Sequence, residues 1–103
     1  MTNELTGLTI AEAAESIEKK SLSPVELTEV YLGRIEALQP TVNAYITVTA
    51  DRARADAKAA EDEIVAGTYR GPLHGIPIAL KDLYETAGIR TTAGSKVHAE
   101  YVP

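Results

Sequence analysis

Lys81 is the residue whose type and position best suit chemistry. It directly follows an uninterrupted apolar run, residues 76–80, and precedes Asp82. A run of this kind predicts a strand buried on both faces, as in a parallel sheet covered by helices. Sites in α/β proteins lie at the ends of such strands, and burial there favours a neutral lysine amine, which acts as a general base or proton shuttle. Lys81 is therefore our first candidate for a catalytic residue.

A plainer interpretation of Lys81 stays open at this point. A lysine at the end of a strand also lies in solvent and pairs with a nearby carboxylate, here Asp82 or Glu85. Asp82 is typical of a turn or a helix cap more often than of a catalytic acid. Position alone favours this plainer interpretation for both residues.

Other chemistry-bearing residues do not form a recognisable site. His74 and His98 are far apart and have no carboxylate at ligand spacing. Residues 88–96 contain glycines and a lysine but lack the order of a phosphate-binding loop. Ser95 follows Gly94 without the glycine pattern of a nucleophile elbow, so a turn role is expected for it. The sequence predicts no metal site and no cofactor.

Composition narrows the class of protein. The 103 residues make at most one small domain, and 10 Lys plus Arg against 15 Asp plus Glu give a net charge of −5. Binding of nucleic acid by a basic face is therefore disfavoured. The absence of cysteine excludes a disulfide scaffold and a thiolate nucleophile. With no signal peptide and no run of about 18 apolar residues, we expect a cytoplasmic protein that does not enter the membrane.

The first helix is predicted by a capping box. Thr9 is suited to cap the helix, and Glu12, three residues later, to reach back to the backbone of Thr9. The apolar residues that follow fall on one helical face, so this face is expected to be buried. They are Ile10, Ala13, Ala14 and Ile17.

The second helix has a stronger start and a predicted stop. Ser23 and Glu26 form another capping box, with Pro24 at the first helical position, where its missing N–H costs nothing. Pro40 is predicted to end this helix. Its apolar stripe consists of Leu27, Val30, Tyr31, Ile35 and Leu38.

A third helix is predicted after an extended segment, residues 42–48, which need not pair as a strand. From about Ala50 the chain is rich in alanine and in charged residues, and Gly67 lies where the helix should end. Two opposite-charge pairs at the i, i+4 spacing support this helix. They are Arg52 with Asp56 and Lys58 with Asp62.

The pattern as a whole predicts an α/β fold that is incomplete in this chain. The strand near 76–80 needs neighbours, but the other candidates are only residues 42–48 and a weak run near Thr91. We divide the chain into an N-terminal helical layer, residues 1–70, and the start of an α/β core, residues 71–103, which is not an independent domain.

One motif links the chain to a known family. Residues 71–82 read GPLHGIPIALKD, residues 86–88 read TAG and residues 91–95 read TTAGS. These segments, in this order after the helices described above, strongly resemble the amidase signature family. The likeness covers essentially all of the chain, and its most specific part is residues 74–82.

The resemblance implies a fold and an activity. Members have a mixed sheet flanked by helices, and this chain would supply the N-terminal helices and the first core strand of that fold. They act on small-molecule carboxamides through a Ser–cis-Ser–Lys triad, need no cofactor and often pair as homodimers. The lysine of the triad stands at the position of Lys81, and it relays protons through the bridging serine to the nucleophilic serine.

The chain departs from the family by what it lacks. Both family serines lie in a Gly- and Ser-rich segment downstream of the lysine, and no such segment occurs here. The 103 residues alone are therefore predicted to be inactive, and their partner would be the remainder of the amidase chain or a complementing chain.

Two other functions stay open. One is the glutaminase-like subunit of a tRNA-dependent amidotransferase, which resembles the same motif but commonly has Asn after Lys-Asp. Leu83 stands in that place here and favours a stand-alone amidase. The other is a non-catalytic helical interaction module. The apolar run 76–80 argues against it, because in such a module this run would be exposed and would promote association.

Overall fold

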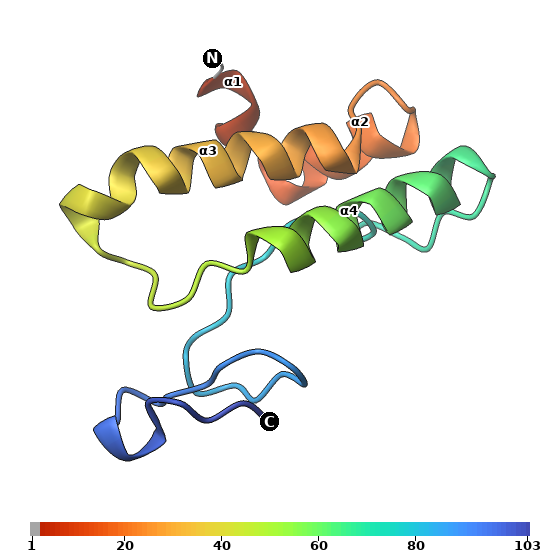
Figure 1. Ribbon diagram of the computed structural model, residues 1–103. Helices are drawn as coiled ribbons and strands as arrows, with labels where there is room; N and C mark the ends of the chain where they lie inside the picture. Colours follow the sequence, from red (N-terminus) through yellow and green to blue (C-terminus); the bar gives the residue numbers. More distant parts are fainter. Residues whose placement is uncertain (1–2) are drawn as a thin grey trace.

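The computed structural model describes residues 3–103 and shows a small helical layer followed by a looped segment (Figure 1). Helix α3 packs along α4, and the short helix α1 packs on α3. The chain after residue 80, blue in Figure 1, lies beyond the helices and folds into turns. The described elements are α1 (Asn3–Thr6), α2 (Ile10–Glu18), α3 (Pro24–Val42), α4 (Ala50–Val65) and the 3-10 helix η1 (Lys96–His98).

Helix α2 begins as the sequence predicts. The Thr9 hydroxyl accepts a hydrogen bond from the N–H of Glu12 at 3.1 Å, and the Glu12 carboxylate accepts one from the N–H of Thr9 at 2.9 Å. These reciprocal bonds confirm the capping box. The helix closes through Lys20, which adopts a left-handed backbone with φ of 65° and donates its N–H to the carbonyl of Ile17.

Helix α3 begins at Pro24 as predicted, and the Ser23 hydroxyl caps it by accepting the N–H of Glu26 at 2.9 Å, but the reciprocal bond of the predicted capping box is not observed. The helix runs past its predicted stop. Pro40 lies inside the helix, so the prediction that it ends the helix is wrong. Pro40 lacks an N–H and its ring crowds the carbonyl of Glu36, and the helix ends two residues later at Val42. The Gln39 amide oxygen accepts from the backbone N–H groups of residues 44–45, and Asn43 turns the chain with a φ of 47°.

Helix α4 carries both predicted ion pairs. The Arg52–Asp56 pair measures 3.2 Å and the Lys58–Asp62 pair 3.1 Å. Gly67 ends the helix with φ of +100°, donating its N–H to Ile64. This left-handed glycine after the last turn is the termination that the sequence predicts.

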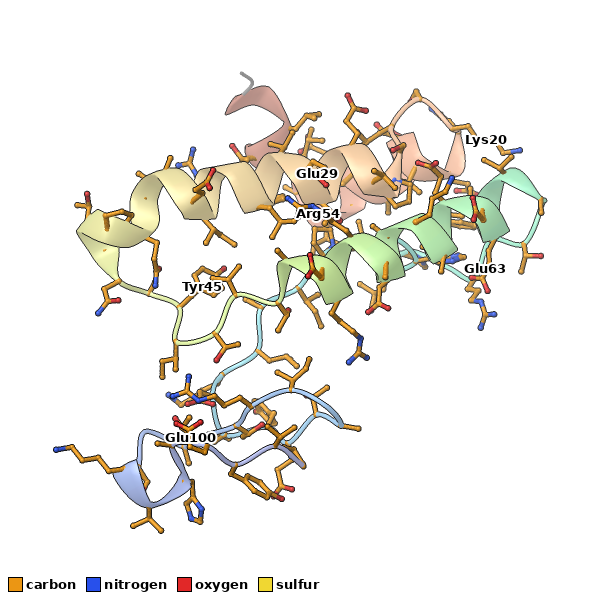
Figure 2. All side chains as sticks on the ribbon, viewed as in Figure 1. Lys20, Glu29, Tyr45, Arg54, Glu63 and Glu100 are labelled. Carbon is orange, nitrogen blue, oxygen red and sulfur yellow. The ribbon has the colours of Figure 1, made fainter. Side chains whose placement is uncertain are left out.

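An ion pair joins the two long helices on their outer side. The Arg54 guanidinium of α4 donates to the Glu29 carboxylate of α3 at 2.6 Å and 3.3 Å. Figure 2 labels both residues. Both side chains are about half exposed, so the pair adds little stability by itself. It links two helices that pack along each other.

The core lies between α2, α3 and α4. Ile17 and Leu27 are its fully buried large side chains, and each such burial contributes roughly 1.5–3 kcal/mol. The ends of the predicted stripes are different, because Ile10 is 52% and Leu38 42% exposed. The buried cluster consists of Ala13, Ile17, Leu22, Leu27 and Ile64, with Ile76 packed against it.

The predicted strand near 76–80 is not formed, and this corrects the α/β expectation for the described residues. They contain helices and turns, and their one β-type contact is an isolated bridge between Thr86 and Ile89. Residues 76–80 form no strand because the described part of the chain offers them no neighbouring strand. Ile78 and Leu80 are consequently 74% and 56% exposed instead of buried on both faces.

Candidate functional site

Lys81 lies at the end of the irregular segment 76–80 and is exposed. Its backbone carbonyl accepts hydrogen bonds from the N–H groups of Leu83 at 2.7 Å and Tyr84 at 3.1 Å, so the chain turns immediately after it. The lysine helps to line an open groove of about 1060 Å³ between the helices and this segment. Tyr31, Tyr45, Val48, Ile76 and Ile78 are among the other residues of its lining.

The neighbouring carboxylate does not pair with Lys81. Asp82 Oδ1 accepts the N–H of Thr92 at 2.8 Å, and Asp82 Oδ2 accepts the hydroxyl of the same threonine. The hydroxyl and backbone hydrogen bonds from Thr92, in that order, lower the pKa of Asp82 below its ordinary value. Asp82 is therefore bound to Thr92, and an ion pair between Asp82 and Lys81 is not observed.

Backbone hydrogen bonds hold together the loop region, residues 86–103, which contains Thr92. The N–H of Thr91 donates to the carbonyl of Tyr101 at 2.9 Å, and the N–H of Gly88 donates to the carbonyl of Pro103 at 2.9 Å. Thr91 and Thr92 are 6% and 5% exposed, although both are polar. The loop region thus has a buried polar centre of its own, directly beside the turn at Lys81.

Glu85, the other carboxylate considered for Lys81, is also engaged elsewhere. It accepts the hydroxyl of Tyr101 at 2.9 Å. This hydrogen bond, together with desolvation and the nearby negative charge, raises the pKa of Tyr101. Neither carboxylate proposed as a simple partner of Lys81 therefore takes that role.

A polar cluster that sequence reasoning missed holds the chain ahead of Lys81. The His74 side chain is 7% exposed; its Nε2 lies 2.9 Å from Glu63 Oε1, and its Nδ1 accepts the N–H of Arg70 at 3.0 Å. Because Nδ1 of His74 accepts a hydrogen bond, the ring N–H is on Nε2, which donates to Glu63. The Tyr69 ring stacks on the imidazole with ring centroids 6.2 Å apart. No sequence pattern marks this cluster, because its partners are brought together by the turn after α4.

The remaining candidates take structural roles. Ser95 accepts the N–H of Val97 at 3.1 Å and caps η1, which confirms its turn role. His98 packs edge-on against the ring of Tyr101. Within residues 3–103, no group of three or more His, Cys, Asp or Glu side chains is placed to hold a metal ion. No helix in the same range is long and apolar enough to cross a membrane.

Comparison with known families gives one match. The family model described as "Amidase" matches residues 26–103, from the first turn of α3 through the loop region. The match includes Lys81, Asp82 and Thr92.

Curated relatives are similar over nearly the whole chain. A protein from Granulibacter bethesdensis, by name a subunit of glutamyl-tRNA(Gln) amidotransferase, is 54% identical over 99 residues, which is 96% of this chain and 20% of that protein. Proteins of the same name from Geobacter metallireducens and Rhodopseudomonas palustris are 53% and 47% identical over 100 residues, 97% of this chain and 20% of each relative. The chain thus spans about one fifth of the length of these relatives.

Proposed function

Because the chain belongs to the amidase family, we propose that it is the N-terminal part of an enzyme that hydrolyses a carboxamide C–N bond, with Lys81 as a catalytic residue. The observation that carries this proposal is the family match across residues 26–103, which includes the Lys-Asp pair. The position of Lys81 supports it, because an exposed lysine on the lining of an open groove is accessible to groups brought by the rest of the enzyme.

In the proposed mechanism Lys81 moves a proton and does not bind the substrate carbonyl. Its side chain accepts the proton of a nucleophilic serine through a bridging serine, and that proton later passes to the leaving amine. An acyl-enzyme forms and water resolves it. No Gly- and Ser-rich segment of the kind that carries both serines follows Lys81, so the 103 residues alone are proposed to be inactive.

The rest of the enzyme is the proposed partner of this chain. Ile78 and Leu80 are exposed beside the groove, and apolar side chains in such positions are suited to packing against another part of a core. In this proposal residues 1–70 are the outer helical layer, and residues 71–103 join a sheet that the remainder of the enzyme completes. The segment 76–80 becomes a strand when that sheet supplies its hydrogen-bonding partners.

A second candidate function has a specific observation in its favour. The relatives that match nearly the whole chain at 54%, 53% and 47% identity carry the name of a glutamyl-tRNA(Gln) amidotransferase subunit. In this alternative the amide is glutamine, and the released ammonia is used by a complex with other subunits. Leu83, after Lys-Asp, is the residue that favours the stand-alone amidase instead.

Ammonia release by the full-length enzyme tests both candidates. The enzyme is offered simple carboxamides and, separately, glutamine, each with and without glutamyl-tRNA(Gln). Release from simple carboxamides, unaffected by the tRNA, is the result expected for the stand-alone amidase. Release confined to glutamine and raised by the tRNA supports the second candidate. A folded full-length enzyme that releases no ammonia from any of these amides would overturn the proposed function.

A further inference from the structure

We propose that Asp82 is a positioning residue. It fixes the direction of the neighbouring Lys81 because both of its carboxylate oxygens are hydrogen-bonded to Thr92. This inference rests on the proposed function of Lys81. It assigns no contact with the substrate to Asp82 or Thr92. Their role is to hold the backbone on which the catalytic amine is carried.

Both carboxylate oxygens of Asp82 accept hydrogen bonds from the same residue, Thr92. Asp82 Oδ1 accepts the backbone N–H of Thr92 at 2.8 Å, and Oδ2 accepts its hydroxyl. Two bonds to groups fixed on the same residue define the orientation of the carboxylate plane as well as its distance. Since Asp82 follows Lys81 in the chain, this orientation also limits the rotation of the peptide between them.

Thr92 is itself held in place by burial and by hydrogen bonds. It is 5% exposed, and its hydroxyl oxygen accepts the N–H of Gly94 at 3.1 Å while donating to Asp82. The preceding residue, Thr91, is tied to the carbonyl of Tyr101 at 2.9 Å. Thr92 is therefore part of a hydrogen-bonded loop and cannot simply follow the movements of Asp82.

Lys81 lies between two points at which side-chain hydrogen bonds hold the chain. Residues 76–80 form no strand in the described part of the chain, so no ladder of hydrogen bonds holds them along their length. Their upstream end is fixed where His74 binds Glu63 at 2.9 Å. Asp82 supplies the corresponding fixed point at the downstream end. A lysine amine on a four-carbon stem depends on such a fixed backbone, and a displacement of about 1 Å can cost roughly 100-fold in rate.

The geometry also separates this role from a simple ion pair. If Asp82 served to neutralise the Lys81 ammonium, at least one of its oxygens would be turned toward the amine. Both are instead engaged with Thr92, ten residues further along the chain. Asp82 therefore acts on Lys81 through the backbone.

The test uses five substitutions in the full-length enzyme with ammonia release as the assay. Asp82→Asn replaces one accepting oxygen, and Thr92→Val removes the hydroxyl that Asp82 binds. Both are expected to lower kcat about 10- to 100-fold with KM changed less than about 3-fold, because the substrate is still bound but the amine is misplaced. Thr92→Ser keeps the hydroxyl and is expected to keep kcat within about 3-fold of the parent.

Thr91→Val is the matched control. Thr91 is as buried as Thr92, but its hydroxyl donates to the carbonyl of Ile89 at 3.1 Å and does not touch Asp82. A merely structural role of the buried threonines predicts similar losses from Thr91→Val and Thr92→Val. The positioning role predicts a loss of kcat for Thr92→Val alone, with rescue by serine at that position.

Lys81→Ala separates failure of this inference from failure of the proposed function. If Lys81→Ala retains turnover, Lys81 is not catalytic and the proposed function itself fails. If Lys81→Ala is inactive while folded Asp82→Asn turns over at the parent rate, the positioning role is overturned and the proposed function stands. Asp82→Asn gives this answer even if Thr92→Val does not fold.

Discussion

Glu63 is the residue that ties helix α4 to the chain leading toward Lys81. Its carboxylate accepts from Arg70 Nη2 at 2.8 Å and from His74 Nε2 at 2.9 Å (its side chain is labelled in Figure 2). The hydrogen bond from Arg70 is the largest cause that lowers the pKa of Glu63, followed among the favourable causes by the positive charge of Arg70 and the hydrogen bond from His74. The cluster thus favours the charged carboxylate in the folded state.

This lowered pKa predicts a pH-dependent contribution to stability. Because the folded pKa lies below the ordinary value of 4.5, the contribution is fully present above about pH 4.5 and is lost as the pH falls through the folded pKa. Glu63→Gln is therefore expected to lower the urea midpoint at pH 7, and the difference from the parent should narrow at pH 3. Glu18→Gln, an exposed glutamate at the end of α2, is the control. A difference that is the same at both pH values would contradict the prediction.

At this scale the sequence makes Lys81 a candidate but does not predict the contacts on either side of it. Lys81 is a candidate because the apolar run before it and Asp82 after it form a local pattern. The hydrogen bonds between Asp82 and Thr92 join residues ten positions apart, and the contact between His74 and Glu63 joins residues eleven positions apart. Such contacts depend on how turns bring segments together, which composition and spacing do not encode.

At the scale of elements, the start of α3 and the turn before residue 76 meet at unusually close range. Gly75 adopts φ of +87°, and a Cβ built on it would lie 2.7 Å from Cγ and 3.1 Å from Cβ of Pro24. Pro24 is the first residue of α3 and is itself buried. The absence of a side chain at Gly75 is therefore what allows the turn to pack against the helix.

Gly75→Ala is expected to destabilise the chain more than Gly67→Ala. Gly67 also has positive φ, +100°, but a Cβ there would meet nothing within 4 Å. Both substitutions carry a left-handed backbone penalty of roughly 1–2 kcal/mol, and Gly75→Ala adds overpacking of roughly 1–3 kcal/mol. Urea unfolding followed by circular dichroism measures the difference between the two. Equal losses for the two variants would show that the contact with Pro24 is unimportant.

The elements also show where sequence patterns succeed. The starts of α2 and α3 were predictable because a cap and its helix are adjacent in the chain, as Thr9 and Ser23 demonstrate. The end of α3 was not, because side-chain bonds from Gln39 close the helix after Pro40. The strand near 76–80 was mispredicted for a related reason: a strand requires a partner, and the described chain offers none.

At the scale of the whole molecule, the chain buries a small core and leaves a large apolar surface open. Ile17 and Leu27 are its fully buried large side chains, whereas Ile78 is 74% and Leu80 56% exposed on the groove of about 1060 Å³. Exposed apolar groups of this kind favour association with another surface. The predicted family is confirmed, because the family model matches residues 26–103. The core strand that the resemblance implies is not formed in the described residues.

The 103-residue chain by itself is therefore expected to self-associate as its concentration rises. Ile78→Lys should reduce this association, since it places a charge on the apolar surface beside the groove. Val97→Lys is the matched control, because Val97 is 86% exposed but lies on η1, outside the groove lining. Sedimentation velocity over a range of concentrations measures the effect. A parent chain that remains monomeric throughout would support an independent helical module and contradict this prediction.

Lys81 is proposed to be catalytic, and substitution of this lysine in the full-length enzyme tests that role. Ammonia release from the amide accepted by the full-length enzyme is compared between the parent, Lys81→Ala and, as a control, Lys96→Ala on η1. We expect Lys81→Ala to lose about 10³- to 10⁶-fold in kcat with its fold retained, and Lys96→Ala to resemble the parent. Near-parental turnover by a correctly folded Lys81→Ala enzyme would contradict the account.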